Sequence, residues 1–540
     1  MFVGDYLGRR ALYSPDQLAI VDAGKVPHRT FTYRELNDRA NRLANWLRDG
    51  AGVQKGDRVA ILAHNGVEFL DTFFACGKLG AILVPFNWRL HWREVSQLVE
   101  KTTPKVMIYS DEFQDTIAQV VADTNIIHHL LHIEGKGLPN SRYFEKTLSD
   151  SVLRPVTTEG VREEDIACVI FTGGTTGLPK AAQVSHRMIG WNTLNTIIHD
   201  LQHGDVTVNT FPLFHTGGLL VYTTPLLILG GTVVLTRKFD AEQVLSLLEE
   251  YSATVYAGVP TMYQMLTTSP NWTQADLSNL RFCTSGGAPL PVHLVEQFRV
   301  EKGVQFKQGF GMSEFGPGVF ALAPEDAIRK AGSIGRPNFF VDAQIVDEHN
   351  QPVPPGHVGE LVLRGPSMCS GYLNDPEATA AVVDEEGWFH TGDLATMEDA
   401  LRRVFEAWGT IGETVFGHCG AGLCVRPHHR ALCLGCGFLV PHHKNAPKVL
   451  TYRKMYAQFA ALLEPLHELS VQLGASVEHP EARAYLESQQ GSGKGGKLAK
   501  ALLALAAADQ ASRGRESARV ALEGRIERAE RWNAMIGAPA

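Results

Sequence analysis

The stretch "IACVIFTGGTTGLPKAAQVSH", residues 166–186, decides how the chain is interpreted. It opens with a mainly apolar run, which predicts a buried strand, and a loop of Gly and Thr follows directly. Backbone N–H groups in such a loop can converge on phosphate oxygens. The hydroxyls of Thr172, Thr175 and Thr176 add donors, and Lys180 adds positive charge. The pattern predicts a phosphate-binding loop directly after a strand.

This loop departs from the common Walker sequence, in which Gly is followed at once by Lys and Ser or Thr. Here Leu178 and Pro179 separate Gly177 from Lys180. The competing interpretation is a flexible linker of small residues. Linkers rarely follow a buried strand and end in Pro-Lys, so the phosphate loop is favoured.

The surrounding sequence alternates between strand and helix patterns. Short apolar runs at 58–63, 81–86 and 105–110 read as strands, and "GVEFLDTFFACGKLG" at 66–80 reads as a helix. This alternation implies βαβ units, a largely parallel, covered sheet and an α/β fold class. From about residue 341, two strand-like runs around a Pro/Gly turn predict a small β subdomain.

Length and composition are those of a multidomain globular protein. The chain has 540 residues, 44% of them hydrophobic and 20% charged, which is too long for one core. The N-terminal sequence has no apolar run behind its basic pair, so no signal peptide is expected. Residues 217–235 are uncharged but are interrupted by Pro225, which favours a buried helix and strand over a membrane span. We expect a cytoplasmic protein with reduced thiols.

Charge and cysteine content change sharply near residue 400. Residues 401–540 carry 18 Lys and Arg against 12 Asp and Glu, a net charge of +6. The whole chain has 50 against 58, so the first 400 residues carry −14. Four of the eight cysteines also fall between residues 419 and 436. The chain therefore reads as two different kinds of sequence joined end to end.

Four further motifs follow the loop in a fixed order. They are "FPLFH" (211–215), "TSGGAPL" (284–290), "QGFGMSEFGPG" (308–318) and "GWFHTGDLA" (387–395). With the loop, they make residues 1–398 resemble an adenylate-forming enzyme of the acyl-CoA synthetase and luciferase superfamily, closest to the fatty-acyl and aryl-CoA ligases. The resemblance implies a large core of layered α/β subdomains with a small β subdomain. It also implies an AMP-forming acyl-CoA ligase, which uses ATP, Mg²⁺ and CoA to activate a fatty or aryl carboxylic acid through an acyl-adenylate.

The resemblance also assigns roles to individual residues. Ser313 takes the position that touches the α-phosphate, Glu314 that of the Mg²⁺ ligand, and Asp393 that of the carboxylate accepting both ribose hydroxyls. A solvated surface charge is the alternative for Glu314, and a helix cap for Asp393. The triphosphate loop corresponds to Thr172, Gly173, Gly174, Thr175, Thr176, Gly177 and Lys180, and the wall beside the adenine to Gly286, Gly287, Ala288, Gln308, Gly309 and Phe310.

Two more residues have both a functional and an ordinary interpretation. His215 resembles the gate between the acyl pocket and the AMP site, although a satisfied core histidine is about equally expected. Lys238 stands where relatives contact the CoA nucleotide, whereas a solvated lysine is the ordinary interpretation.

Residues 399–540 do not continue the family pattern. No Gly-Arg-x-Lys hinge motif is found there, and only "GKLAKALL" (496–503) echoes the loop that carries the family's catalytic lysine. Lys494 and Lys497 are poor replacements because their surroundings are Ala-rich. Loss of that lysine and of the mobile domain would impair full turnover. The alternatives are a nucleotide-binding core tethered to a zinc- or DNA-binding tail, and a non-functional gene fusion.

The segment that follows is dense in soft metal ligands. Cys419, Cys424, Cys433 and Cys436 predict one structural Zn²⁺, with His418 or His428 as substitutes; metal-free thiols are the alternative. The cluster and the basic helical pattern beyond it resemble the C-terminal ends of some site-specific recombinases, which implies nucleic-acid contact; an exposed charged helix is the ordinary interpretation. The predicted divisions are an adenylation core at 1–398, a Cys/His-rich segment at 399–447 and a basic, mainly helical tail at 448–540.

Overall fold

The computed structural model describes residues 5–156, 160–173 and 179–398, together with the backbone of 413–414, 417–419 and 439–441. Residues 1–403 form one compact unit and residues 404–540 form another.

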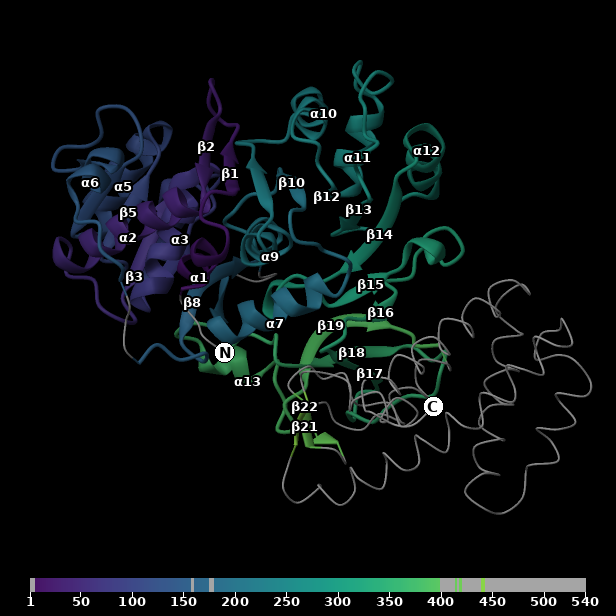
Figure 1. Ribbon diagram of the computed structural model, residues 1–540. Coiled ribbons are helices and arrows are strands. Elements are labelled where there is room, and N and C mark those ends of the chain that lie inside the picture. The colour runs from purple at the N-terminus through teal and green to yellow at the C-terminus, as the bar shows by residue number, and fades with distance from the viewer. Residues whose placement is uncertain are drawn as a thin grey trace, which may run out of the picture. The chain divides into compact units, whose positions relative to one another are not determined.

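Two large sheets organise the first unit (Figure 1). The strand order is β7-β6-β5-β3-β4-β8-β9 in the seven-stranded sheet and β16-β15-β14-β13-β12-β10-β11-β1-β2 in the nine-stranded sheet. The first sheet contains β3 (Arg58–Leu62), β4 (Ile82–Pro85), β5 (Val106–Tyr109), β6 (His129–His132), β7 (Arg142–Tyr143), β8 (Ile166–Thr172) and β9 (Lys180–Ser185). The second contains β1 (Leu18–Asp22), β2 (Arg29–Thr32), β10 (Val206–Asn209), β11 (Thr232–Leu235), β12 (Val255–Gly258), β13 (Phe282–Gly286), β14 (Gln305–Phe310), β15 (Phe320–Leu322) and β16 (Arg336–Pro337).

Helices cover both faces of these sheets. They are α1 (Tyr6–Tyr13), α2 (Tyr33–Asp49), α3 (Val67–Leu79), α4 (Trp92–Thr102), α5 (Gln114–Thr124), α6 (Phe144–Asp150), α7 (His186–Ile197), α8 (Thr216–Leu220), α9 (Thr223–Leu229), α10 (Ala241–Glu250), α11 (Pro260–Thr267), α12 (Val292–Lys302) and α13 (Pro376–Ala380). Three 3₁₀ turns are η1 (Asp111–Phe113), η2 (Ser313–Phe315) and η3 (Pro324–Asp326). The predicted βαβ alternation is confirmed, with strands and a helix at the four expected ranges. The expected layered α/β core is present, and its largely parallel strands are divided between two sheets.

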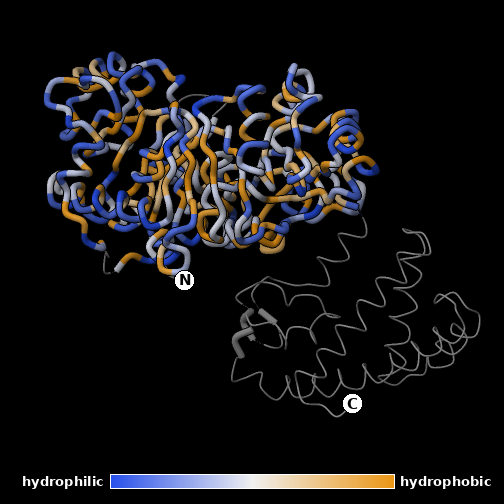
Figure 2. Tube along the Cα trace, turned by 45° about the horizontal axis from the view of Figure 1, so that its top comes forward, coloured by the Kyte–Doolittle hydropathy of each residue, from blue (hydrophilic) through white to orange (hydrophobic). Residues whose placement is uncertain are grey.

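The period-two pattern of the strands explains the layering. In β3, Val59 and Ile61 join the core between the two sheets, whereas Ala60 and Leu62 join a second core beneath α4 and α5. A third core lies between the nine-stranded sheet and helices α10 to α12. Figure 2 shows the result as hydrophobic colour along the central strands and hydrophilic colour on the peripheral segments. Strands covered on both faces read as continuous apolar runs, which is why the sequence identified them.

Helix α3 is buried along its whole length, including Glu68 and Asp71. Buried carboxylates need partners, and two arginines supply them. Arg39 donates to Asp71 Oδ2 at 2.7 Å and to Glu145 Oε1 at 2.8 Å. Arg29 donates to Glu68 Oε1 at 2.7 Å. Because Arg29 lies on β2 and Glu68 on α3, this contact ties the edge of one sheet to the helix layer of the other.

The predicted small β subdomain is also present. It is an antiparallel sheet of β17 (Asp342–Val346), β18 (Gly359–Arg364) and β19 (Phe389–Ala395). Its apolar face packs on Phe315, whose ring centroid lies 5.7 Å from that of Phe389. This contact fixes the small sheet beside η2, the turn that carries Ser313 and Glu314.

The uncharged run at 217–235 forms α8, α9 and β11. The prediction of one helix and a strand missed the break at Val221 and Tyr222, between α8 and α9. In the part of the chain that the structure describes, no helix is long and apolar enough to cross a membrane.

The described segments of the second unit are three short strands. They are β20 (Glu413–Thr414), β21 (Gly417–Cys419) and β22 (Leu439–Pro441), paired antiparallel in that order. The predicted helices after residue 448 lie outside the described residues.

Candidate active site

The predicted phosphate loop joins two hydrogen-bonded strands. Thr172, at the end of β8, pairs antiparallel with Lys180, at the start of β9. A Cβ added to Gly173 would meet nothing within 4 Å, so open space adjoins this end of the loop. The remaining predicted loop residues, Gly174, Thr175, Thr176 and Gly177, lie outside the described residues.

Two adjacent parallel strands bring the predicted adenine wall together. Gly286 at the end of β13 pairs with Gly309 of β14, and Ser285 pairs with Gln308. The side chain of Gln308 accepts a hydrogen bond from the Leu290 N–H at 3.2 Å, which anchors the segment after β13. These strands end at one sheet edge, the position where α/β proteins bind ligands.

Glycine is required at two points of this wall. A Cβ at Gly286 would lie 3.3 Å from the Gly309 carbonyl oxygen, which is tighter than ordinary contact. Gly287 has a φ of +78°, a conformation that other residues rarely adopt. Ala288 follows this turn, and Phe310 closes β14, directly before the turn with Ser313 and Glu314.

Glu314 is buried rather than solvated, so the surface-charge interpretation is wrong. Its residue is 7% exposed, and Oε1 accepts a hydrogen bond from the Tyr372 hydroxyl at 2.9 Å. The neighbouring Ser313 hydroxyl lies 3.2 Å from the hydroxyl of Thr216, the first residue of α8. Thr216, which follows the "FPLFH" motif, and Tyr372 therefore both contact the turn η2.

Tyr372 was missed by sequence reasoning, although it joins the predicted residues. The Lys180 Nζ lies 4.9 Å from the centroid of the Tyr372 ring, and the hydroxyl of that ring reaches Glu314. Burial, followed by the Glu314 carboxylate, raises the pKa of Tyr372 far above its ordinary value, so the hydroxyl stays protonated and donates. The available signal was a large aromatic residue inside the otherwise polar loop "SGYLNDPEAT" at 370–379.

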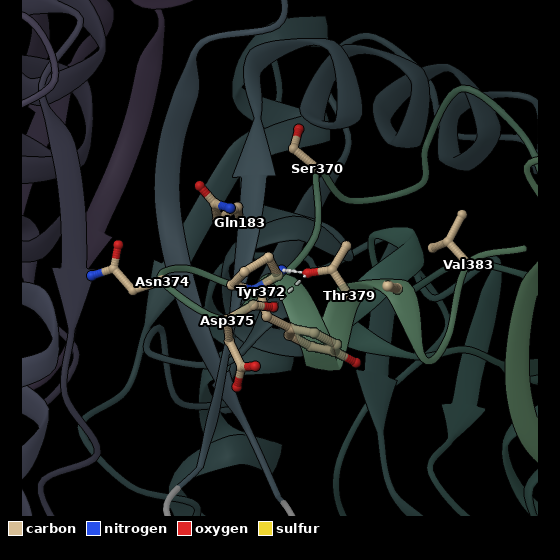
Figure 3. A pocket seen from close by; sticks show the side chains of 9 residues that line it. Gln183, Ser370, Tyr372, Asn374, Asp375, Thr379 and Val383 are labelled. Atoms are coloured by element: carbon tan, nitrogen blue, oxygen red, sulfur yellow. Dashed lines mark hydrogen bonds between the residues drawn. The ribbon is translucent and has the colours of Figure 1, made fainter. Parts of the chain in front are cut away.

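The Tyr372 backbone borders a shallow surface pocket of about 470 Å³ (Figure 3). Its N–H donates to Thr379 Oγ1 at 2.9 Å, a bond drawn in the figure. Lining side chains include Gln183, Asn374 and Asp375. None of the predicted site residues lines this pocket, although Tyr372, which does, contacts both Lys180 and Glu314.

His215 is the residue before α8, and its side chain is exposed, so it is not a core histidine. Its ring centroid lies 4.7 Å from that of Phe214. Desolvation by the surrounding protein and, second, the charge of Arg89 lower the pKa of His215. The imidazole is therefore mainly neutral at pH 7.

Asn65, also missed, holds the His215 segment in place. Its Nδ2 donates to the Phe211 carbonyl at 2.9 Å, and its Oδ1 accepts from the Leu213 N–H at 2.9 Å. Asn65 follows β3 of the seven-stranded sheet, whereas Phe211 follows β10 of the nine-stranded sheet. One buried amide thus sets the position of the "FPLFH" motif across the two sheets.

Replacing Asn65 with Ala is expected to destabilise the protein by roughly 1–3 kcal/mol, because buried backbone groups lose their partners. Chemical denaturation of the whole chain measures this. Asn45→Ala removes a comparable buried amide from helix α2, away from the motif. If both variants lose stability but only Asn65→Ala weakens substrate binding, the result supports the role of Asn65 in positioning the "FPLFH" motif. If the two variants bind substrate equally well, that role is contradicted.

Asp393 lies within β19 and is exposed, so the helix-cap interpretation is wrong. Its backbone N–H donates to Thr391 Oγ1 at 3.0 Å. Lys238 is exposed after β11. Its contact with CoA and the contact of Asp393 with the ribose stay predictions.

Glu314 suits a magnesium ion bound together with a substrate phosphate. It is a buried carboxylate, and within residues 5–156, 160–173 and 179–398 no Lys, Arg or His forms an ion pair with it. Buried charges are normally paired or bind metals. Those residues contain no cluster of three or more His, Cys, Asp and Glu that could hold a metal. Mg²⁺ needs no such cluster, because it often uses one or two carboxylates plus phosphates and water.

The predicted zinc ligands remain a prediction. Only the backbone of Cys419 is described, in β21, and Cys424, Cys433 and Cys436 lie outside the described residues.

Comparisons with known proteins agree on the first unit. A family model described as AMP-binding enzyme matches residues 7–373. A feruloyl-CoA synthase of Amycolatopsis sp is 38% identical over 397 residues, which cover 73% of this chain and 76% of that protein. A long-chain-fatty-acid–CoA ligase of Salmonella typhimurium is 30% identical over 423 residues, covering 72% and 74%. The crystal structure of the N-terminal domain of FACL13 from Mycobacterium tuberculosis superposes with a TM-score of 0.68 at 29% identity, covering 74% of this chain and 98% of that one.

Proposed function

Because the chain belongs to the AMP-binding enzyme family, we propose that it activates a fatty or aryl carboxylic acid with ATP and transfers the acyl group to CoA. The enzyme class is that of its relatives, the AMP-forming acyl-CoA ligases. One observation carries the proposal most strongly: Tyr372 connects Lys180, at the end of the phosphate loop, with the buried carboxylate of Glu314.

The chemistry is a phosphoryl-centre substitution. A carboxylate oxygen of the acid attacks the α-phosphorus of ATP, the bond to the bridging oxygen breaks, and pyrophosphate leaves. The protein has to align the two reactants and offset the charge on the leaving group. In this proposal Lys180 and the loop N–H groups hold the β- and γ-phosphates, and Ser313 contacts the α-phosphate. Mg²⁺, bound by Glu314, would supply charge neutralisation on the phosphates.

The rest of the nucleotide occupies the sheet edge. The segment Gly286–Ala288 and the strand end Gln308–Phe310 would flank the adenine, and Asp393 would accept the ribose hydroxyls. His215 would separate the acyl pocket from AMP, and Lys238 would contact the CoA nucleotide. The relatives named for ferulate and for long-chain fatty acids support an apolar acid in either class.

Acid-dependent exchange of labelled pyrophosphate into ATP tests this function, because it requires a reversible adenylate. Thioester formation is a separate step. We propose that it is slow in this chain, since residues 399–540 carry no recognisable hinge or lysine motif of the family.

For the tail we propose one structural Zn²⁺ held by Cys419, Cys424, Cys433 and Cys436. Four thiols within 18 residues are close enough in sequence for one tetrahedral site. Elemental analysis of the purified full chain is expected to give one zinc per chain, and chelation to change the circular dichroism. Absence of stoichiometric zinc would leave these residues as ordinary thiols.

A further inference from the structure

We propose that Tyr372 is a positioning residue that holds the Glu314 carboxylate and the Lys180 ammonium in the arrangement needed to bind magnesium–ATP. The inference rests on the proposed function, because it takes Glu314 as the metal ligand. It adds a residue that the loop and turn motifs do not contain.

The backbone around Tyr372 is fixed on both sides. The segment 369–373 runs along the outer edge of β9, with Ala182 bridged to Tyr372. The Leu373 N–H donates to the Ala181 carbonyl at 2.8 Å, and the Gln183 N–H donates to the Gly371 carbonyl at 2.9 Å. Lys180 begins the same strand, so its position and that of Tyr372 are set by one hydrogen-bonded ladder.

The same segment is also tied to the turn that bears Glu314. The Cys369 N–H donates to the Glu314 backbone carbonyl at 2.7 Å. The Tyr372 side chain, in a residue only 5% exposed, then reaches the Glu314 carboxylate. Two contacts from one short segment, one to the backbone and one to the side chain, therefore determine where this carboxylate lies.

Each part of the tyrosine has a separate task. The hydroxyl donates to Oε1, which restricts rotation of the carboxylate and leaves its other lone pairs for a metal. Partners that orient a metal ligand commonly contribute 10- to 100-fold in affinity. The ring attracts the Lys180 ammonium electrostatically and keeps it at the end of the phosphate loop. Removing only the hydroxyl should therefore weaken the binding of Mg²⁺ by Glu314. Removing the ring should also weaken the contact between Lys180 and the phosphates of ATP.

The alternative is a purely structural role, in which Tyr372 only packs between β9 and η2. Tyr33 provides a matched control, because its hydroxyl donates to the Gly231 carbonyl at 2.6 Å and its residue is fully buried. Tyr33 lies on α2, in the core between the sheets and away from the motifs. Tyr372→Phe and Tyr33→Phe each remove one buried hydroxyl, so a purely structural role would give both the same effects.

The experiment is calorimetric titration of the full chain with ATP, once with Mg²⁺ and once with EDTA, alongside thermal unfolding. The quantity compared is the ratio of the ATP affinity with Mg²⁺ to the ATP affinity with EDTA. Tyr372→Phe is expected to lower this ratio by about tenfold and to leave the ATP affinity with EDTA unchanged. Tyr33→Phe should keep the parent's ratio of affinities. Tyr372→Leu should weaken metal-free binding as well, because the Lys180 contact is lost.

The inference is overturned if Tyr372→Phe keeps the parent's ratio of affinities, or weakens binding equally with and without metal. If the parent binds Mg–ATP but exchanges no pyrophosphate with any acid, the proposed function is refuted. The ratio of affinities would then still test the positioning role of Tyr372. A parent that binds no ATP would overturn both.

Discussion

Replacing Glu314 with Gln is expected to lower acid-dependent pyrophosphate exchange by on the order of 10²–10³-fold. The amide keeps the size of the side chain but removes the charge that a magnesium ion needs. Because Glu314 is buried, water cannot readily take over its role. The variant should still fold, since an amide oxygen can accept the hydrogen bond from Tyr372.

Glu301→Gln is the matched control. Glu301 also accepts a side-chain hydrogen bond, from Trp272, but it lies in α12 on the outer face of the nine-stranded sheet. The Glu301→Gln variant should exchange pyrophosphate at the same rate as the parent. A Glu314→Gln protein that exchanges pyrophosphate as fast as the parent would remove the magnesium assignment.

Replacing residues 399–540 with the C-terminal domain of an intact relative is expected to raise the rate of CoA thioester formation by on the order of 10²–10³-fold. The family resemblance implies that this domain brings a lysine that stabilises charge in adenylation and a surface that completes the thioester site. Thioester product is measured by chromatography with CoA and the acid that supports exchange. The same fusion with that lysine changed to Ala separates the charge effect from the effect of the added surface. A parent chain that already forms thioester as fast as an intact relative would show the slow-turnover proposal to be wrong.

Strands covered on both faces were the easiest elements to predict. The runs that became β3, β4, β5 and β8 are apolar at successive positions, because one side of each strand faces the central core and the other an outer core. The neighbours with which these strands pair in a sheet could not be predicted in the same way. Which strands share a sheet depends on long-range pairing, such as β1 with β11, and no local pattern records it.

The site shows the same division. Residues inside short ordered motifs, such as Ser313 and Glu314, could be proposed from the sequence because the motif itself carries them. Burial of Glu314 and the connection through Tyr372 could not be found, since residues 314 and 372 are 58 positions apart in the sequence and no local pattern records their contact. Asn65 was missed for a related reason: its two partners in the "FPLFH" motif lie almost 150 residues away in sequence.

The most direct measurement is pyrophosphate exchange by the unmodified full chain, with ATP, Mg²⁺ and a panel of acids that includes long-chain fatty acids, hydroxycinnamic acids and short polar acids. Our account predicts exchange that depends on an apolar acid and on magnesium, and that is absent without either. Tight binding of Mg–ATP with no exchange for any acid in the panel would contradict the claim that this core forms an acyl-adenylate.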